Sequence, residues 1–218
     1  MLFAVLLRHL ANMALPERPP AELQSWPLPL VSVQGTLWRS HWTKDHPIYF
    51  GRSGENRWDA PDRSYGICYA AESPDGAFAE GYFTDPGMLA WIKVGDHFTV
   101  PVSGTYLDIR AVSPVVVLRP LQVVDLRGDG ILQIGADATL VNGPHDISQR
   151  WGHALFTHPE KPDGIVWRSR VTHEVVAYAL HERARDLVES DPSDALSAPR
   201  NRQLLSKIVR RFRLAIIR

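Results

Sequence analysis

Cysteine is almost absent from this chain, which has one, Cys68, among its 218 residues. A single cysteine cannot form an internal disulfide, so a disulfide scaffold is excluded and a reducing compartment fits. Cys68 lies between apolar residues in YGICYAA and is predicted to fill the core. An excess of charge is also missing, because 24 basic residues balance 24 acidic ones. Global charge therefore favours neither nucleic acid nor an acidic membrane as a partner.

Long apolar runs are missing as well. The N-terminal MLFAVLL is interrupted by Arg8 and His9, follows no positively charged segment and precedes no clean cleavage site. No uninterrupted apolar run approaches the ~18 residues of a membrane span. We therefore expect a soluble, cytoplasmic protein.

Several familiar chemical motifs are absent too. The chain contains no Walker A sequence, no G-x-G-x-x-G and no G-x-S-x-G elbow, and GRSGEN at 51–56 precedes no helix-forming run. The histidines lack metal-ligand spacing; His153 and His158, for example, are five residues apart. The spacing therefore predicts no metal site.

The remaining pattern is that of a mixed α and β protein. A length of 218 residues with 44% hydrophobic residues is typical of one globular domain with extensions. The proline-rich stretch 16–30 reads as an extended lead-in outside the packed sheet, and 41–64 reads as a long polar loop. HEVVAYALHERA, at 173–184, fits a strand or a helix. The expected strands are 35–40, 65–71, several within 98–127, and 165–167, and the expected helices are 74–83, 145–157 and 201–213.

One acid lies in an unusually apolar helical segment, SPDGAFAEGYF at 73–83. Ser73 is a typical N-cap, and Glu80 then lies about two turns into the helix on the same face as Ala77 and Gly81. Small neighbours would let another element or a ligand approach the carboxylate. Taken alone, Glu80 is better explained as a surface acid at the edge of the core.

Other polar residues lie next to predicted strands, where a core would not select them. These are Arg39, Arg57, Tyr65, Tyr69 and Ser169. Each has a structural explanation, since an arginine stem can pack while its head reaches water, and a buried tyrosine can have its hydroxyl satisfied.

Together, the order and spacing of these residues resemble the RES-domain family, which is named for an arginine, a glutamate and a serine. LWRSHW, RWDAPDRSYGICYAAESPDGAFAE and DGIVWRSR match its motifs in order and make Arg39, Glu80 and Ser169 the naming residues. The resemblance covers roughly residues 35–185. It divides the chain into an N-terminal extension, 1–34, a RES domain and a C-terminal extension, 186–218, with an amphipathic basic helix.

The aromatic positions of these motifs depart from the family pattern. Trp38 and Trp58 occupy places where the family more often has tyrosine or phenylalanine. Both changes preserve aromatic character, so they bear on substrate detail more than on the fold.

The resemblance implies an α+β fold like that of ADP-ribosyltransferases, with a mixed, largely antiparallel core of two packed sheets and flanking helices. It implies NAD as the substrate. Arg39, Glu80 and Ser169 would be catalytic, and the cofactor-binding residues would be Arg39, Arg57, Tyr65, Tyr69 and Ser169. The family's usual partner is an Xre-type antitoxin with a DNA-binding portion, and 41–64 and the basic C-terminal helix are the candidate contacts.

These residue types suit cleavage of the nicotinamide–ribose bond. The reaction passes through an oxocarbenium-like state that a carboxylate can stabilise, as in glycoside cleavage. Arginines can hold the pyrophosphate, tyrosines can stack on a ring and a serine can orient a ribose. The residues leave three functions open: an NAD glycohydrolase or phosphorylase, a protein ADP-ribosyltransferase, and a non-catalytic binding module with a RES fold.

Overall fold

The structure is a computed structural model that describes residues 17–84, 91–94 and 96–217. The MLFAVLL segment lies outside the described residues. Within them, no helix is both long enough and apolar enough to cross a membrane.

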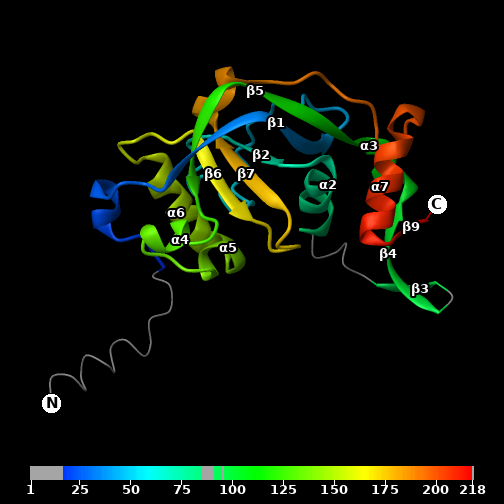
Figure 1. The fold of residues 1–218 in the computed structure, drawn as a ribbon, viewed down its shortest axis with the longest axis horizontal. Helices are drawn as coiled ribbons and strands as arrows, with labels where there is room; N and C mark the ends of the chain where they lie inside the picture. The colour runs from blue at the N-terminus through cyan, green and yellow to red at the C-terminus, as the bar shows by residue number, and fades with distance from the viewer. Residues whose placement is uncertain (1–16, 85–90, 95, 218) are drawn as a thin grey trace, which may run out of the picture.

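The described strands form two sheets (Figure 1). The larger has the order β1-β2-β7-β6-β5-β8 and the smaller the order β3-β4-β9. Because β1 also pairs with β5, the strands β1, β2, β7, β6 and β5 close into a barrel. The strands are β1 (Leu30–Trp42), β2 (Ile67–Ala71), β3 (Ile92–Val94), β4 (His97–Ser103), β5 (Arg110–Asp125), β6 (Gly164–Arg168), β7 (Val176–His181), β8 (Val188–Glu189) and β9 (Leu214–Ile217).

The helices lie on two sides of the barrel (Figure 1). One group, α4 to α6, covers one side, while α2 lies between the barrel and α7. The expected helices at 74–83, 145–157 and 201–213 are confirmed as α2, α6 and α7. The helical elements are η1 (Ala21–Ser25), α2 (Pro74–Phe83), α3 (Gly104–Ile109), α4 (Gly130–Gln133), α5 (Thr139–Asn142), α6 (His145–Phe156), η3 (Glu182–Leu187), η4 (Pro199–Asn201) and α7 (Arg202–Phe212).

The expected α+β class is confirmed, with a difference in how the sheets are arranged. The sheets are mixed, since β5–β6 and β4–β9 are parallel pairs and the remaining pairs are antiparallel. The sequence led us to expect a core of two packed sheets, but the larger sheet closes on itself. Local sequence patterns do not predict that a sheet closes into a barrel, because the β1–β5 pairing joins segments about 80 residues apart in the chain.

The proline-rich lead-in is packed, contrary to expectation. Leu23 and Leu28 are 0% and 8% exposed and belong to the main core, and Leu30 already pairs with Val124. Prolines remove backbone donors but do not prevent the leucines between them from being buried. β1 therefore begins five residues before the expected start at 35. Its one irregularity lies between Val33 and Gly35, where the glycine has a φ of +87°.

Two other segments differ from or extend the expectation. The segment 173–184 contains the whole of the buried strand β7 and the start of η3, and burial of all six β7 side chains explains why no alternation was visible. The stretch TYLDI, expected within the β-rich region, belongs to the short helix α3, whose first turn is capped by Ser103.

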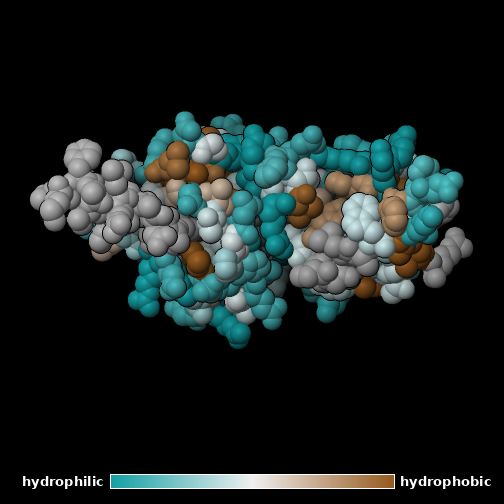
Figure 2. Space-filling model, turned by 90° about the horizontal axis from the view of Figure 1, so that it is seen from below, coloured by the Kyte–Doolittle hydropathy of each residue, from teal (hydrophilic) through white to brown (hydrophobic). Residues whose placement is uncertain are grey.

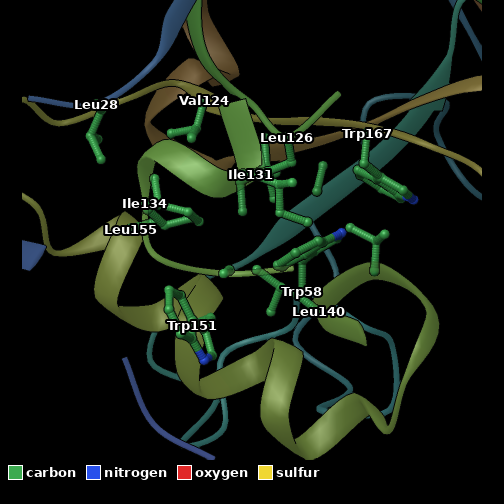
Figure 3. Packing of buried hydrophobic residues seen from close by; sticks show 14 of the residues in the cluster. Leu28, Trp58, Val124, Leu126, Ile131, Ile134, Leu140, Trp151, Leu155 and Trp167 are labelled. Atoms are coloured by element: carbon green, nitrogen blue, oxygen red, sulfur yellow. The ribbon is translucent and has the colours of Figure 1, made fainter. Parts of the chain in front are cut away.

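Three tryptophans organise the core between the barrel and α4–α6 (Figure 3). Trp58 and Trp151 are fully buried, and Trp58 meets Trp167 edge to face with ring centroids 5.6 Å apart. Trp58 follows Arg57 directly in the chain. Anchoring this indole therefore also fixes the loop that carries a candidate site residue.

The C-terminal elements support α2. β9 pairs with β4, and α7 packs on α2 through a shared apolar cluster. The Asp75 side chain at the start of α2 is only 1% exposed and binds Arg211 at 2.5 Å and Lys207 at 3.3 Å. Part of the basic face of α7 thus anchors α2.

We predict that Asp75→Asn lowers the free energy of unfolding by about 2 kcal/mol at neutral pH, because the neutral amide no longer forms the ion pairs with Arg211 and Lys207. Burial raises the pKa of Asp75, but the hydrogen bond and charge of Arg211 outweigh it, so the net pKa lies below 3.8. This stabilisation is present above 3.8 and disappears as pH falls through the lowered folded-state pKa.

Urea unfolding of both proteins at neutral and at strongly acid pH measures this effect. The difference in stability should shrink at acid pH. Asp108→Asn, an exposed acid on α3, serves as the control and should change little. Equal effects of the two substitutions would refute the anchoring role.

Candidate functional site

A cavity of about 280 Å³ lies where the barrel meets α2 and the 51–64 loop. Arg39 reaches it from β1, Tyr69 from β2, Glu80 from α2 and Arg57 from the loop. Four predicted site residues, separated by up to 41 positions, thus line one cavity.

Glu80 is the acid of this cavity. Its Oε1 is buried and has no hydrogen-bond partner among the described residues. Burial raises the pKa of Glu80, while a hydrogen bond from the Ser169 side chain and the charges of Arg170 and Arg57 oppose the rise. A carboxylate oxygen left unpaired in a cavity is costly unless a ligand satisfies it. This feature favours the functional interpretation of Glu80.

Ser169 lies just beyond the end of β6 and is fully buried. Its amide donates to the Val175 carbonyl at 2.9 Å, and its Oγ accepts from the Val171 amide at 2.9 Å. The Val171 contact leaves the hydroxyl proton available for the hydrogen bond to the Glu80 side chain. Ser169 is not among the residues that line the cavity, so its role suits orienting Glu80.

Arg39 is tied to neighbouring loops by one end of its guanidinium. Its Nη1 lies 2.5 Å from the Tyr49 carbonyl and 2.7 Å from the Cys68 sulfur. Cys68 is fully buried, as expected for a core residue. The contacts fix the plane of Arg39 while other nitrogen atoms remain available at the cavity.

Among the residues that the structure describes, Arg57 is the only buried arginine. Its Nη1 donates to Ser148 Oγ and the Gly143 carbonyl, both at 2.9 Å, while its Nη2 is buried without a partner in the described part of the chain. Burial, followed by the charge of Arg170, lowers the pKa of Arg57 to about 10. The side chain is still cationic at neutral pH and presents an unused donor.

Asp59 holds the loop that carries Arg57. One of its oxygens accepts from the amides of Gly54 and Asn56, at 3.1 and 3.2 Å. The other accepts from the Tyr69 hydroxyl at 2.9 Å. This buried carboxylate thereby links the expected long loop to β2 and explains why 51–64 is ordered without strands or helices.

The structure separates the two predicted tyrosines. Tyr69 lines the cavity, but Tyr65 does not. The Tyr65 ring is 2% exposed and stacks on Phe156 with ring centroids 3.6 Å apart. Tyr65 precedes the first residue of β2, so strand alternation does not place it on the same face as Tyr69. The structure therefore does not bring Tyr65 to the cavity.

The sequence analysis missed several cavity residues. Arg110, at the start of β5, and Arg170, directly after Ser169, both line the cavity, as does Trp167. Arg170 was detectable, because it belongs to the same DGIVWRSR motif. Arg110 had no local signal, since it reaches the site only through the β1–β5 pairing.

A second cavity, of about 510 Å³, adjoins the first. Both are lined by Arg39, Ser40, Asn56, Tyr69 and Arg110. The candidate site therefore has two lobes that share a cationic junction. Among the described residues no three His, Cys, Asp or Glu side chains gather as they would around a metal ion.

Comparison with known proteins gives a consistent family assignment. A family model described as the RES domain matches residues 36–201. "Probable toxin y4kH" of Sinorhizobium fredii is 37% identical over 93 residues, which cover 42% of this chain and 72% of that protein.

A solved structure has a similar fold. The M. tuberculosis MbcT–MbcA toxin–antitoxin complex contains a chain that matches with a TM-score of 0.61 and 14% identity. The match covers 81% of this chain and 92% of that chain. At this identity the likeness extends to the fold alone.

We predict that Glu80 titrates above the ordinary glutamate value of 4.5, because burial disfavours its charged form. Ser169→Ala should raise this pKa further, since the lost hydrogen bond favours the ionised acid. Carbon-13 NMR of glutamate-labelled protein measures both values. Ser40→Ala, in the same cavity wall, should leave the titration unchanged. A Glu80 pKa at or below 4.5 would contradict this account.

Proposed function

Because the chain belongs to the RES domain family, we propose that it is an enzyme that cleaves the nicotinamide–ribose bond of NAD. The main support for this proposal is Glu80 Oε1, which is buried and has no partner among the described residues, in a cavity lined by Arg39 and Arg57. Such a cavity suits a ligand that has positive charge near the acid and negative charge near the arginines. NAD has this pattern as its nicotinamide bond breaks, because the ribose becomes positively charged while the diphosphate stays negatively charged.

Glu80 would stabilise the positive charge that develops on the ribose as the bond breaks. The ionised form is required, and the Ser169 hydrogen bond together with the nearby arginines favours it despite burial. Ser169 would keep the carboxylate aimed at the ribose. Tyr69, held by Asp59, would supply a fixed aromatic wall.

The arginines would position the diphosphate of the substrate. A planar guanidinium binds phosphate oxygens through two donors at once. Arg39 stands at the junction of the lobes with its plane fixed, and Arg57 has an unused buried donor. We also propose that the fold is similar to that of ADP-ribosyltransferases. Residues 35–185 would form the catalytic unit.

The acceptor depends on what reaches the far face of the ribose: water, phosphate or a protein side chain. Hydrolysis or phosphorolysis is our first proposal, because no separate acceptor-recognition motif stands out in the sequence. Protein ADP-ribosylation would use the same donor cavity. A non-catalytic binding module is the third reading, and retention of Arg39, Glu80 and Ser169 argues against it.

We also propose that the protein acts as a toxin in the cytoplasm and that an antitoxin restrains it. Support comes from the relative's name and from the toxin–antitoxin complex of similar fold. Of the two candidate contacts, the 41–64 loop is better placed, because it supplies Asn56 and Arg57 to the cavity. Hydrogen exchange with and without the protein encoded beside this gene tests the contact. Protection confined to other segments would reject it.

Purified protein incubated with NAD should release free nicotinamide, which chromatography measures, with and without phosphate. Dependence on phosphate would indicate phosphorolysis, and release without it hydrolysis. Absence of release under both conditions would reject hydrolysis and phosphorolysis of NAD. Transfer of labelled ADP-ribose to protein would then support the second reading.

We predict that Glu80→Gln lowers the rate of nicotinamide release by about 100-fold or more, because the charge that stabilises the transition state is lost. Glu80→Asp should lose about tenfold or more, because a shorter side chain does not reach the ribose. Glu72→Gln, an exposed acid just before α2, is the matched control. Equal activity of Glu80→Gln and wild type would remove Glu80 from the mechanism.

A further inference from the structure

The proposed cleavage of the nicotinamide bond takes place at Glu80 in the first lobe and assigns no ligand group to the rest of the second lobe. This second lobe lies beyond Arg39 and Arg110, away from Glu80, which lines only the first lobe. Its volume of about 510 Å³ exceeds the 280 Å³ of the first. A substrate that only inserted a nicotinamide riboside into the first lobe would leave this space unused.

Two exposed aromatic rings line the second lobe. Trp42 is 43% exposed and Tyr49 is 56% exposed. Tyr49 is held in place through its carbonyl, which accepts from Arg39. Solvent-facing aromatic rings at a cavity present π-faces on which a nucleobase can stack.

Arg110 stands between the two lobes with an unused donor. Its Nε is buried and has no hydrogen-bond partner in the described part of the chain. Its guanidinium carbon lies 4.7 Å from the Trp42 ring centroid, and its Nη2 is 3.5 Å from Ser40 Oγ. Stacking on Trp42 orients the guanidinium, and Nε is left for an anion at the junction.

We infer that the second lobe is the subsite for the adenosine half of a dinucleotide, with the diphosphate between Arg39 and Arg110 and the base against Tyr49 and Trp42. The identity of the dinucleotide rests on the proposed function. The order of groups along the site then matches that of the substrate: carboxylate for the reacting ribose, cations for the diphosphate, aromatic rings for the base.

Adenosine diphosphate tests the subsite without any catalysis, because it fills only the junction and the second lobe. Isothermal calorimetry should show binding to wild type and to Glu80→Gln alike. Tyr49→Ala and Arg110→Gln should each weaken binding about tenfold, from lost stacking and a lost phosphate contact. Tyr49→Phe should bind like wild type. Trp91→Ala removes a ring that is 63% exposed but lines neither lobe, and it should have no effect.

The same variants separate this inference from the proposed function. Tyr49→Ala should raise KM for NAD about tenfold and leave KM for nicotinamide mononucleotide, which lacks adenosine, unchanged. Binding of adenosine diphosphate by a chain that does not cleave NAD would support the subsite and reject the enzyme. No binding by wild type, or equal binding by folded Tyr49→Ala and Arg110→Gln, would overturn the subsite.

Discussion

The closure of the barrel by β1 is the constraint on which the site depends. Trp38 is opposite Ala71 on β2 and opposite Pro114 on β5, so one strand joins both edges of the sheet. Closure removes free edges and fixes which strand ends lie side by side. It sets Arg39 beside Tyr69 and brings the start of β5, with Arg110, to the same cavity. A sheet left open between β1 and β5 would separate the two lobes.

The second requirement is a firmly placed α2. Ser73 accepts from the Gly76 amide at 3.1 Å, and the neighbouring Asp75 is held by α7. The side of α2 opposite the barrel packs on aromatic residues of α7 and α3, among them Phe212. On the face seen in Figure 2, hydrophobic residues, in brown, also gather around the small sheet beside these elements. The C-terminal residues thus belong to the support of Glu80.

Local chemistry made most of these elements predictable. Ser73 and the helical spacing gave α2 its correct start, and the ordered motifs brought Arg39, Arg57, Tyr69 and Glu80 to one cavity with Ser169 against the acid. The features that the sequence did not predict depend on contacts between segments far apart in the chain. Tyr65 is four residues from Tyr69, but it lies before β2 and its environment is decided by α6. Arg110 reaches the site because it pairs with Trp42 on β1, which lies about 70 residues earlier in the chain.

The surroundings of the Glu80 carboxylate explain why an acid is kept at this partly buried position. Arginines lower its pKa through their charge, yet in the part of the chain that the structure describes none forms an ion pair with it. A directly bound arginine would satisfy the carboxylate in the resting state and compete with any cation forming on a ligand. Ser169 instead supplies one neutral hydrogen bond, which orients the acid without cancelling its charge. The free oxygen is then best satisfied by positive charge that develops within the cavity itself, and this is the condition for stabilising a transition state more than a ground state.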